Sequence, residues 1–127
     1  MTLIGGDASA VYGNNGDTDG GIGTSTFYYP AGIAVDSAGN YFVAEYENDR
    51  VRKVTSDGTT TTIAGGTSGS TVLPGYVDGV GASARFTDPY GIAVDGAGLI
   101  YVADSFKIVQ FMKMWIFLQK CTKNKEQ

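Results

Sequence analysis

The chain contains two copies of one sequence unit, offset by 59 residues. The segment PAGIAVDSAGNYFVAE at 30–45 returns, without a gap, as PYGIAVDGAGLIYVAD at 89–104. Between 4–45 and 63–104, 17 of 42 aligned residues are identical. Such a period is typical of folds that stack copies of one supersecondary unit, so the fold depends on the unit and on how its copies pack.

Each unit is predicted to form four short antiparallel strands. Short β-branched and aromatic runs are separated by turn signals rich in Asp, Gly and Ser. In the first unit the expected strands are 32–36, 40–45, 50–55 and 59–66. The chain has 19 glycines in 127 residues, about twice average usage, which agrees with many tight turns.

The strands lack the strict alternation of apolar and polar residues that is typical of a sheet with one solvent-exposed face. GIAV at 32–35 and YFVA at 41–44 are apolar at nearly every position, which indicates strands covered on both faces. A repeated four-stranded meander with glycines at fixed positions is typical of a β-propeller, whose blades cover one another around an axis. We therefore predict an all-β chain that forms a partial β-propeller of four-stranded antiparallel blades.

The recurring residues also resemble the NHL repeat, a β-propeller family. The second copy supplies Asp78, Gly79, Gly81, Ala84, Phe86, Pro89 and 91–95 of its pattern. The first copy supplies 43–45, Asn48, 50–52, Val54 and 60–63. The resemblance covers roughly residues 3–110 and implies the propeller fold, whereas function must be argued from a site because propellers host unrelated activities.

Two departures from the family pattern stand out. Asp49 occupies the position that gives the family its histidine, and the second copy breaks off after 104–106. A third strand can be placed there only by dropping two residues, so that Lys107 aligns with Arg50. We therefore divide the chain into an NHL-like propeller fragment at 1–110 and a non-repeat, lysine-rich tail at 111–127.

Three alternatives are open for the tail. It is a segment foreign to the repeat, a helix packed on the last blade, or a membrane anchor. The apolar run 108–118 gives no clean helical face, is too short to span a bilayer and is interrupted by Lys113. We expect no membrane partner.

The count of repeats gives about two blades. Residues 2–6 match 61–65 and predict the last strand of a preceding blade, followed by one complete blade at 32–65 and a partial blade from Gly91. Closed propellers typically have four to eight blades. The chain is therefore expected to be a piece of a larger propeller or to self-associate through its open blade edges.

Five residues are candidates for binding. Glu45 and Asp104 end equivalent strands before a loop, where a carboxylate caps the structure or contacts a ligand at the propeller mouth. Tyr28, Tyr29 and Tyr90 lie where the chain enters each blade, and they pack under the connecting loop or offer aromatic contact to a protein or glycan.

The other repeated carboxylates have simpler interpretations. Asp36 and Asp95 are predicted to form hairpin turns, because Asp accepts hydrogen bonds from backbone amides just ahead of it. Asp19 and Asp78 lie in the long glycine-rich connections and are predicted to anchor those loops.

The string NNGDTDGG matches the opening of a calcium loop at Asn15, Asp17 and Asp19. The twelfth position, which needs a bidentate glutamate, is Thr26, and the second copy lacks the pattern. We predict no metal site and no cofactor.

The charge is unevenly distributed along the chain. Residues 1–106 hold four basic and twelve acidic side chains, whereas 107–127 hold five lysines and one glutamate. The acidic body argues against nucleic acid as a partner, because phosphate binding needs clustered Lys and Arg. Arg50 and Arg52 are two residues apart in one strand and so lie on the same face, and they are predicted to pair with carboxylates of the acidic loops.

The composition favours binding over catalysis. The chain has no histidine, the usual general base and commonest metal ligand, and its single cysteine, Cys121, excludes an intramolecular disulfide. We predict a non-catalytic binding or scaffold module that contacts a protein or glycan through its loops, with no catalytic residue. The alternative is a fragment of a lyase-type or hydrolase-type propeller enzyme with a metal at the central channel. By analogy with long-repeat relatives, an extracellular or surface location is expected, although MTLIGGDASA has no signal-peptide pattern.

Overall fold

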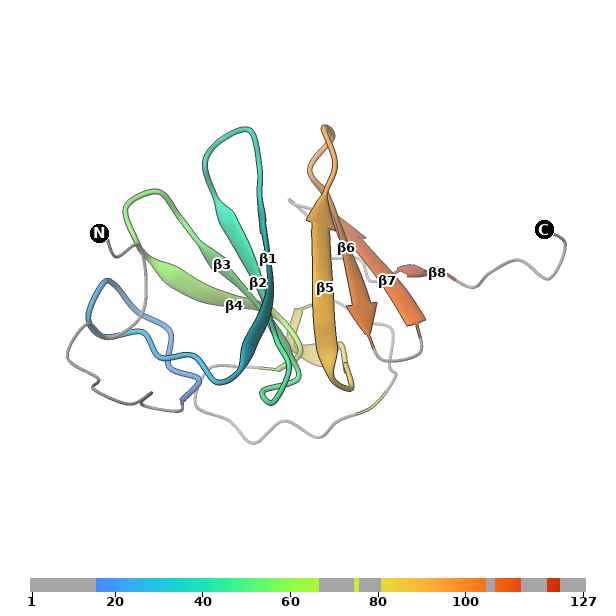
Figure 1. The fold of residues 1–127 in the computed structure, drawn as a ribbon, viewed down its shortest axis with the longest axis horizontal. Coiled ribbons are helices and arrows are strands. Elements are labelled where there is room, and N and C mark those ends of the chain that lie inside the picture. Colours follow the sequence, from blue (N-terminus) through green and yellow to red (C-terminus); the bar gives the residue numbers. More distant parts are fainter. Residues whose placement is uncertain (1–15, 67–74, 76–80, 105–106, 113–118, 122–127) are drawn as a thin grey trace, which may run out of the picture.

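The computed structural model describes residues 16–66, 75, 81–104, 107–112 and 119–121. These residues form two four-stranded antiparallel sheets that stand side by side (Figure 1), with strand orders β1-β2-β3-β4 and β5-β6-β7-β8. The first sheet comprises β1 (Pro30–Val35), β2 (Tyr41–Glu45), β3 (Arg50–Val54) and β4 (Thr60–Ala64). The second comprises β5 (Pro89–Val94), β6 (Leu99–Asp104), β7 (Lys107–Met112) and β8 (Gln119–Cys121). A short 3-10 helix, η1 (Gly81–Ser83), precedes β5.

Each sheet is a meander in which consecutive strands pair, which confirms the predicted all-β partial propeller. The turn chemistry behind the first hairpin is local. Asp36 accepts hydrogen bonds on Oδ1 from the backbone amides of Ala38 and Asn40, both at 2.9 Å. Asp95 accepts from the amides two and four residues ahead at the same distances. The predicted turn role of both aspartates is confirmed.

The second sheet continues past the point where the repeat was expected to break off. Asp104 pairs with Lys107, just as Glu45 pairs with Arg50, so the loop is two residues shorter in the second sheet. The alignment of Lys107 with Arg50 is confirmed.

The expectation of an incomplete second blade was wrong, since β7 extends to Met112 and β8 pairs with it at 119–121. Both described segments of the tail are strands, so the helix considered for it does not lie in these segments. The open edge of β6 offers unpaired backbone groups that an apolar, β-branched segment can satisfy. The boundary expected at residue 110 falls inside β7, and the strand expected at 2–6 lies outside the described residues. Among the described residues, no helix is long and apolar enough to cross a membrane.

The hydrophobic core lies between the two sheets. It joins buried residues of the first sheet, the second sheet and the segment before β5: Phe42, Val51, Ala64, Ala84, Phe86, Ile100 and Val102. The inner strands β1 and β5 lie beside each other at the centre of the fan of strands (Figure 1). Gly32 permits this approach, since a Cβ at that position would meet the backbone of Tyr90 and Gly91.

Candidate functional site

Glu45, the first of the predicted binding residues, is completely buried at the end of β2. Its Oε1 accepts hydrogen bonds from the Tyr28 amide at 2.8 Å and from Asn48 Nδ2 at 3.1 Å. Its Oε2 pairs with Arg52 Nη1 at 3.0 Å. Burial raises the pKa of the Glu45 carboxyl, and the Arg52 charge and the Tyr28 amide offset only part of that rise.

Asp104 repeats the placement of Glu45 in the second sheet. Its side chain is 1% exposed, and its Oδ1 accepts a hydrogen bond from the Thr87 amide at 2.7 Å. Thr87 is 59 residues after Tyr28, so the same backbone amide binds the same strand-end carboxylate in both copies. The geometry therefore gives Glu45 and Asp104 the capping role, and it offers no surface at either carboxylate for direct contact with a partner.

Arg52 is the centre of the polar network on the first sheet. Its five N–H donors, the full complement of a guanidinium, match five hydrogen bonds. Nε and Nη2 bind Asp19 Oδ1 at 3.0 and 2.7 Å, and the remaining bonds reach Glu45 and the carbonyl oxygens of Thr26 and Thr18. The guanidinium also lies 5.1 Å from the ring centroid of Phe27.

The acidic loop before β1 is held by this network and by Arg50. Arg50 Nη1 lies 2.6 Å from Asp17 Oδ2, and its side chain is 1% exposed. Asp19 also accepts hydrogen bonds from the Thr62 amide and hydroxyl, both at 2.9 Å. The predicted pairing of Arg50 and Arg52 with loop carboxylates is confirmed, as is the loop-anchoring role of Asp19.

The possible calcium ligands have other functions in this arrangement. Asp17 and Asp19 pair with arginines, whereas Asn15 lies outside the described residues. Asp78, which was predicted to anchor the second glycine-rich connection, also lies outside them. Across the described part of the chain, no group of three or more His, Cys, Asp and Glu side chains is placed to hold a metal ion.

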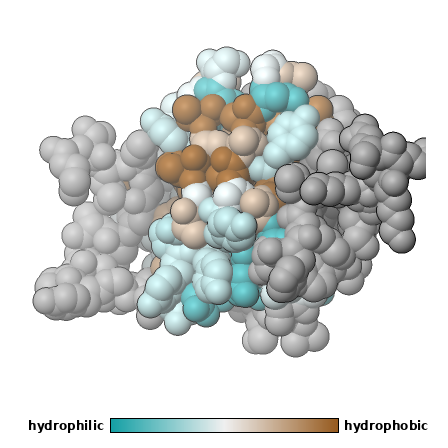
Figure 2. Space-filling view, turned by 45° about the vertical axis from the view of Figure 1, so that its right-hand side comes forward, coloured by the Kyte–Doolittle hydropathy of each residue, from teal (hydrophilic) through white to brown (hydrophobic). Residues whose placement is uncertain are grey.

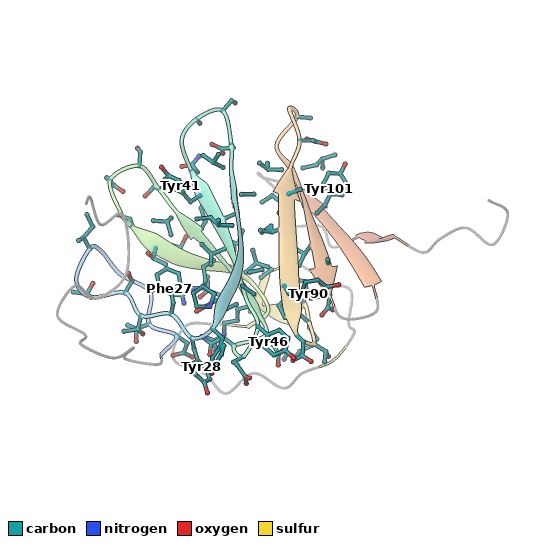
Figure 3. All side chains as sticks on the ribbon, in the orientation of Figure 1. Phe27, Tyr28, Tyr41, Tyr46, Tyr90 and Tyr101 are labelled. Atoms are coloured by element: carbon teal, nitrogen blue, oxygen red, sulfur yellow. The ribbon has the colours of Figure 1, made fainter. Side chains whose placement is uncertain are left out.

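The predicted tyrosines lie at the end of the sheets where the chain enters β1 and β5. Tyr29 is 64% exposed and Tyr90 is 52% exposed, whereas Tyr28 is half-buried and meets the Tyr29 ring edge-on at 5.2 Å. Figure 3 shows Tyr28, Tyr46 and Tyr90 toward the same end of the ribbon, away from Tyr41 and Tyr101.

Tyr46 was missed by sequence reasoning. It is 37% exposed, and its amide donates a hydrogen bond to the Tyr29 carbonyl at 2.9 Å. The only available signal was an aromatic residue immediately after a strand-end carboxylate. We call Tyr28, Tyr29, Tyr46 and Tyr90 together the tyrosine end.

Carboxylate charges act on the Tyr46 phenol. The charge of Asp88 raises the pKa of the Tyr46 phenol above its ordinary value, and burial and the charge of Glu47 add to the rise. Asp49 Oδ1 accepts a hydrogen bond from the Asp88 amide at 2.8 Å. Burial raises the pKa of the Asp49 carboxyl. The tyrosine end is therefore both aromatic and acidic.

Unusual backbone conformations fix this end of the sheets. Tyr29, Asp49 and Asp88 have φ of 47°, 51° and 55°, a left-handed region that non-glycine residues rarely adopt. Tyr29 and Asp88 are equivalent at the 59-residue offset, so the conformation repeats although the side chain does not.

Two four-stranded meanders packed along adjacent inner strands define this chain as part of a β-propeller. A family profile described as "NHL repeat" matches residues 27–54. Residues 27–54 are thus an NHL repeat, and the chain is a partial match to NHL repeat proteins. It is 38% identical over 87 residues to "NHL repeat-containing protein 2" of Bos taurus, a match that covers 63% of this chain and 12% of that protein.

Two crystal structures from Bacteroides thetaiotaomicron share the fold. A structural genomics protein of unknown function matches with a TM-score of 0.61 and 30% identity, over 69% of this chain and 22% of that one. An auxiliary nutrient binding protein matches with a TM-score of 0.64 and 24% identity, over 81% of this chain and 26% of that one. The chain thus spans about a quarter or less of each relative.

Proposed function

We propose that the chain is a non-catalytic binding module that contacts its partner, a protein or a glycan, through the tyrosine end. The observation that carries this proposal is the exposure of Tyr29, Tyr90 and Tyr46 on one end of the two blades. Tyrosine offers a large apolar ring together with a hydrogen-bonding group, a combination enriched at recognition surfaces.

The electrostatics favour a protein partner that carries Lys or Arg side chains. The charges of Asp88, Glu47 and Asp49 all act on the Tyr46 phenol. A cation bound there would be attracted by these carboxylates and by the aromatic ring. A neutral sugar could stack on the tyrosines, but it would gain nothing from the net charge of this surface. Long-range attraction would also assist a basic partner, because residues 1–106 carry a net charge of −8.

Catalysis is the weaker alternative for this chain. Metal-dependent propeller chemistry of the zinc type rests on histidine ligands, and the sequence contains no histidine. The buried carboxylates are bound within the blade, so they are not offered to a substrate.

The proposal can be tested with two probe sets. The full chain is applied to a library of short Lys/Arg-containing peptides, paired with copies in which Glu replaces each basic residue, and to a neutral glycan array. We expect binding to basic peptides that weakens with salt. The double variant Tyr29→Ala/Tyr90→Ala should lower affinity by about tenfold or more.

Ile22→Ala is the matched control, because Ile22 is 52% exposed and lies outside the tyrosine end. Its affinity should stay unchanged. Binding to neutral glycans alone would replace the protein partner with a glycan, and binding that survives the tyrosine double variant would contradict the proposed surface.

A further inference from the structure

The contact between the two sheets uses one defined face of each. On the second sheet, Ile92 and Val94 of β5 and Ile100 and Val102 of β6 pack toward the shared core. Register confirms that they share a face, since Ile92 pairs with Val102 and Val94 pairs with Ile100. We call these four residues and their equivalents in the first sheet the leading face of a blade.

The leading face of the first sheet is not covered in the same way. The equivalents of Ile92 and Val94 are Ile33 and Val35, which are 66% and 55% exposed. Their partners in β2 are Val43 and Tyr41, in the same register as in the second sheet. Val43 is buried and Tyr41 is half-buried, so the exposed part of this leading face is its β1 edge, whereas the equivalent β5 residues pack on a neighbouring sheet.

The chain also carries the surface that would cover it. The second sheet packs on the opposite face of the first sheet, which we call the trailing face and which includes Phe42 and Val51. Its residues on β1 and β2 are, by register, Gly32, Ala34, Phe42 and Ala44. The second sheet has at the same register positions Gly91, Ala93, Tyr101 and Ala103. Ala93 is exposed, and Tyr101 and Ala103 are half-buried.

Leading and trailing faces are different surfaces, so copies that join through them associate head to tail. Such heterologous contacts close into a ring when the rotation per unit permits it. The rotation needed here is the one that two consecutive blades already adopt within the chain. Figure 2 shows hydrophobic side chains gathered in one band of the surface that it presents, above a hydrophilic region.

We propose that the exposed leading face around Ile33 and Val35 binds the trailing face of a second copy of this chain, and that repeated contacts close a propeller from several chains. The four to eight blades of known propellers correspond to about two to four copies. A second copy is the occupant supported by the structure, because the contact between β1–β4 and β5–β8 already shows how the two faces fit.

Native mass spectrometry and light scattering of the full chain test this inference. We expect a discrete oligomer of two to four copies. Ile33→Asp, which places a charge on the leading face, and Ala93→Arg, which blocks the trailing face, should each give monomers. Ala38→Asp and Ala97→Arg are matched controls, since both residues are exposed in equivalent hairpin turns, and both should keep the oligomer.

Mixing the two monomeric variants separates head-to-tail assembly from a symmetric contact. Each variant retains one intact face, so the mixture should form a one-to-one dimer and no larger species. Circular dichroism of each variant shows whether the strands persist, and Ala93→Arg serves if Ile33→Asp fails to fold. A monomeric parent chain, a heterogeneous aggregate, or an oligomer that neither substitution disrupts would overturn the inference.

Discussion

Arg52 and Glu45 form an ion pair of 3.0 Å in which neither side chain is exposed to solvent. A buried pair of this kind depends on complete hydrogen bonding, because each charge has lost its hydration. Arg52 meets that condition through its further bonds to Asp19, Thr18 and Thr26. The pair thus links the strand end of β2 to the loop that precedes β1.

Replacing Arg52 should therefore strongly destabilise the folded chain. Arg52→Ala leaves the buried Glu45 carboxyl and the Asp19 loop without their cation, and we expect a loss of about 3–5 kcal/mol in the free energy of unfolding. Arg52→Lys should recover only part of it, since an ammonium has three donors in place of five. Urea denaturation followed by circular dichroism measures both.

Lys53→Ala is the control for Arg52, because Lys53 is the next residue of β3 and is only half-buried. Lys53→Ala should change the free energy of unfolding by no more than about 0.5 kcal/mol. If Arg52→Ala proved as mild as Lys53→Ala, the network would not hold the loop.

Local chemistry explains which parts of this site could be predicted from sequence. Asp36 and Asp95 accept hydrogen bonds from amides two and four residues ahead, so each turn is determined by residues within its own segment. The pairing of Arg52 with a loop carboxylate was predictable from alternation on a strand and from an acidic loop. The sequence did not predict that this carboxylate would be Asp19, which is 33 residues from Arg52, because the pairing depends on how the loop folds over the sheet.

The parts that escaped prediction depend on tertiary placement. Tyr46 joins the tyrosine end through the Tyr29 carbonyl, and Asp49 reaches Asp88 across 39 residues, with positive φ at both aspartates. No residue pattern marks these contacts. The start of β7 was predictable once the loop was shortened by two residues, but its extension to Met112 and the pairing of β8 were not. The repeat pattern ends there, whereas strand pairing needs only open backbone groups at a sheet edge.

The pKa shifts predict opposite pH dependences for two kinds of carboxyl. Burial raises the pKa of Glu45 above 4.5, so its contribution to stability is full below that pH and is lost as pH rises through the folded pKa. Backbone hydrogen bonds, chiefly from Leu99, lower the pKa of Asp95 below 3.8, so its contribution is present above that pH and is lost as pH falls through the folded pKa.

Urea unfolding of the parent chain, Glu45→Gln and Asp95→Asn across the acidic range tests both signs. Relative to Glu45→Gln, the parent should lose stability as pH rises above 4.5. Relative to Asp95→Asn, the parent should gain stability as pH rises toward and past 3.8. The difference in free energy of unfolding between parent and variant should change with pH in opposite directions for the two pairs. If it changed in the same direction for both, the assigned pKa shifts would be wrong; a constant difference between the proteins does not affect this test.

The acidity of the tyrosine end can be measured directly. Because the Asp88 charge is the largest cause of the raised Tyr46 pKa, Asp88→Asn should lower that pKa toward its ordinary value of 10.0. Carbon NMR of the tyrosine rings, with Tyr46 assigned by its absence in Tyr46→Phe, follows the titration. Asp57→Asn removes an exposed carboxyl of the β3–β4 turn and should leave Tyr46 unchanged, and equal effects of the two substitutions would show that Asp88 has no special position.

The close approach of the two inner strands gives the last prediction. A Cβ at Gly32 would meet the backbone carbonyl of Tyr90, which cannot rotate away as a flexible side chain can. Gly32→Ala must therefore push β1 from β5 and open the core between the sheets, and we expect a loss of about 1–3 kcal/mol in the free energy of unfolding. Gly96→Ala is the control, since nothing lies within 4 Å of a Cβ there. Its thermal unfolding should match that of the parent chain, whereas Gly32→Ala should unfold at lower temperature. Coincident transitions for the two variants would mean that the inner strands are not packed as closely as the structure shows.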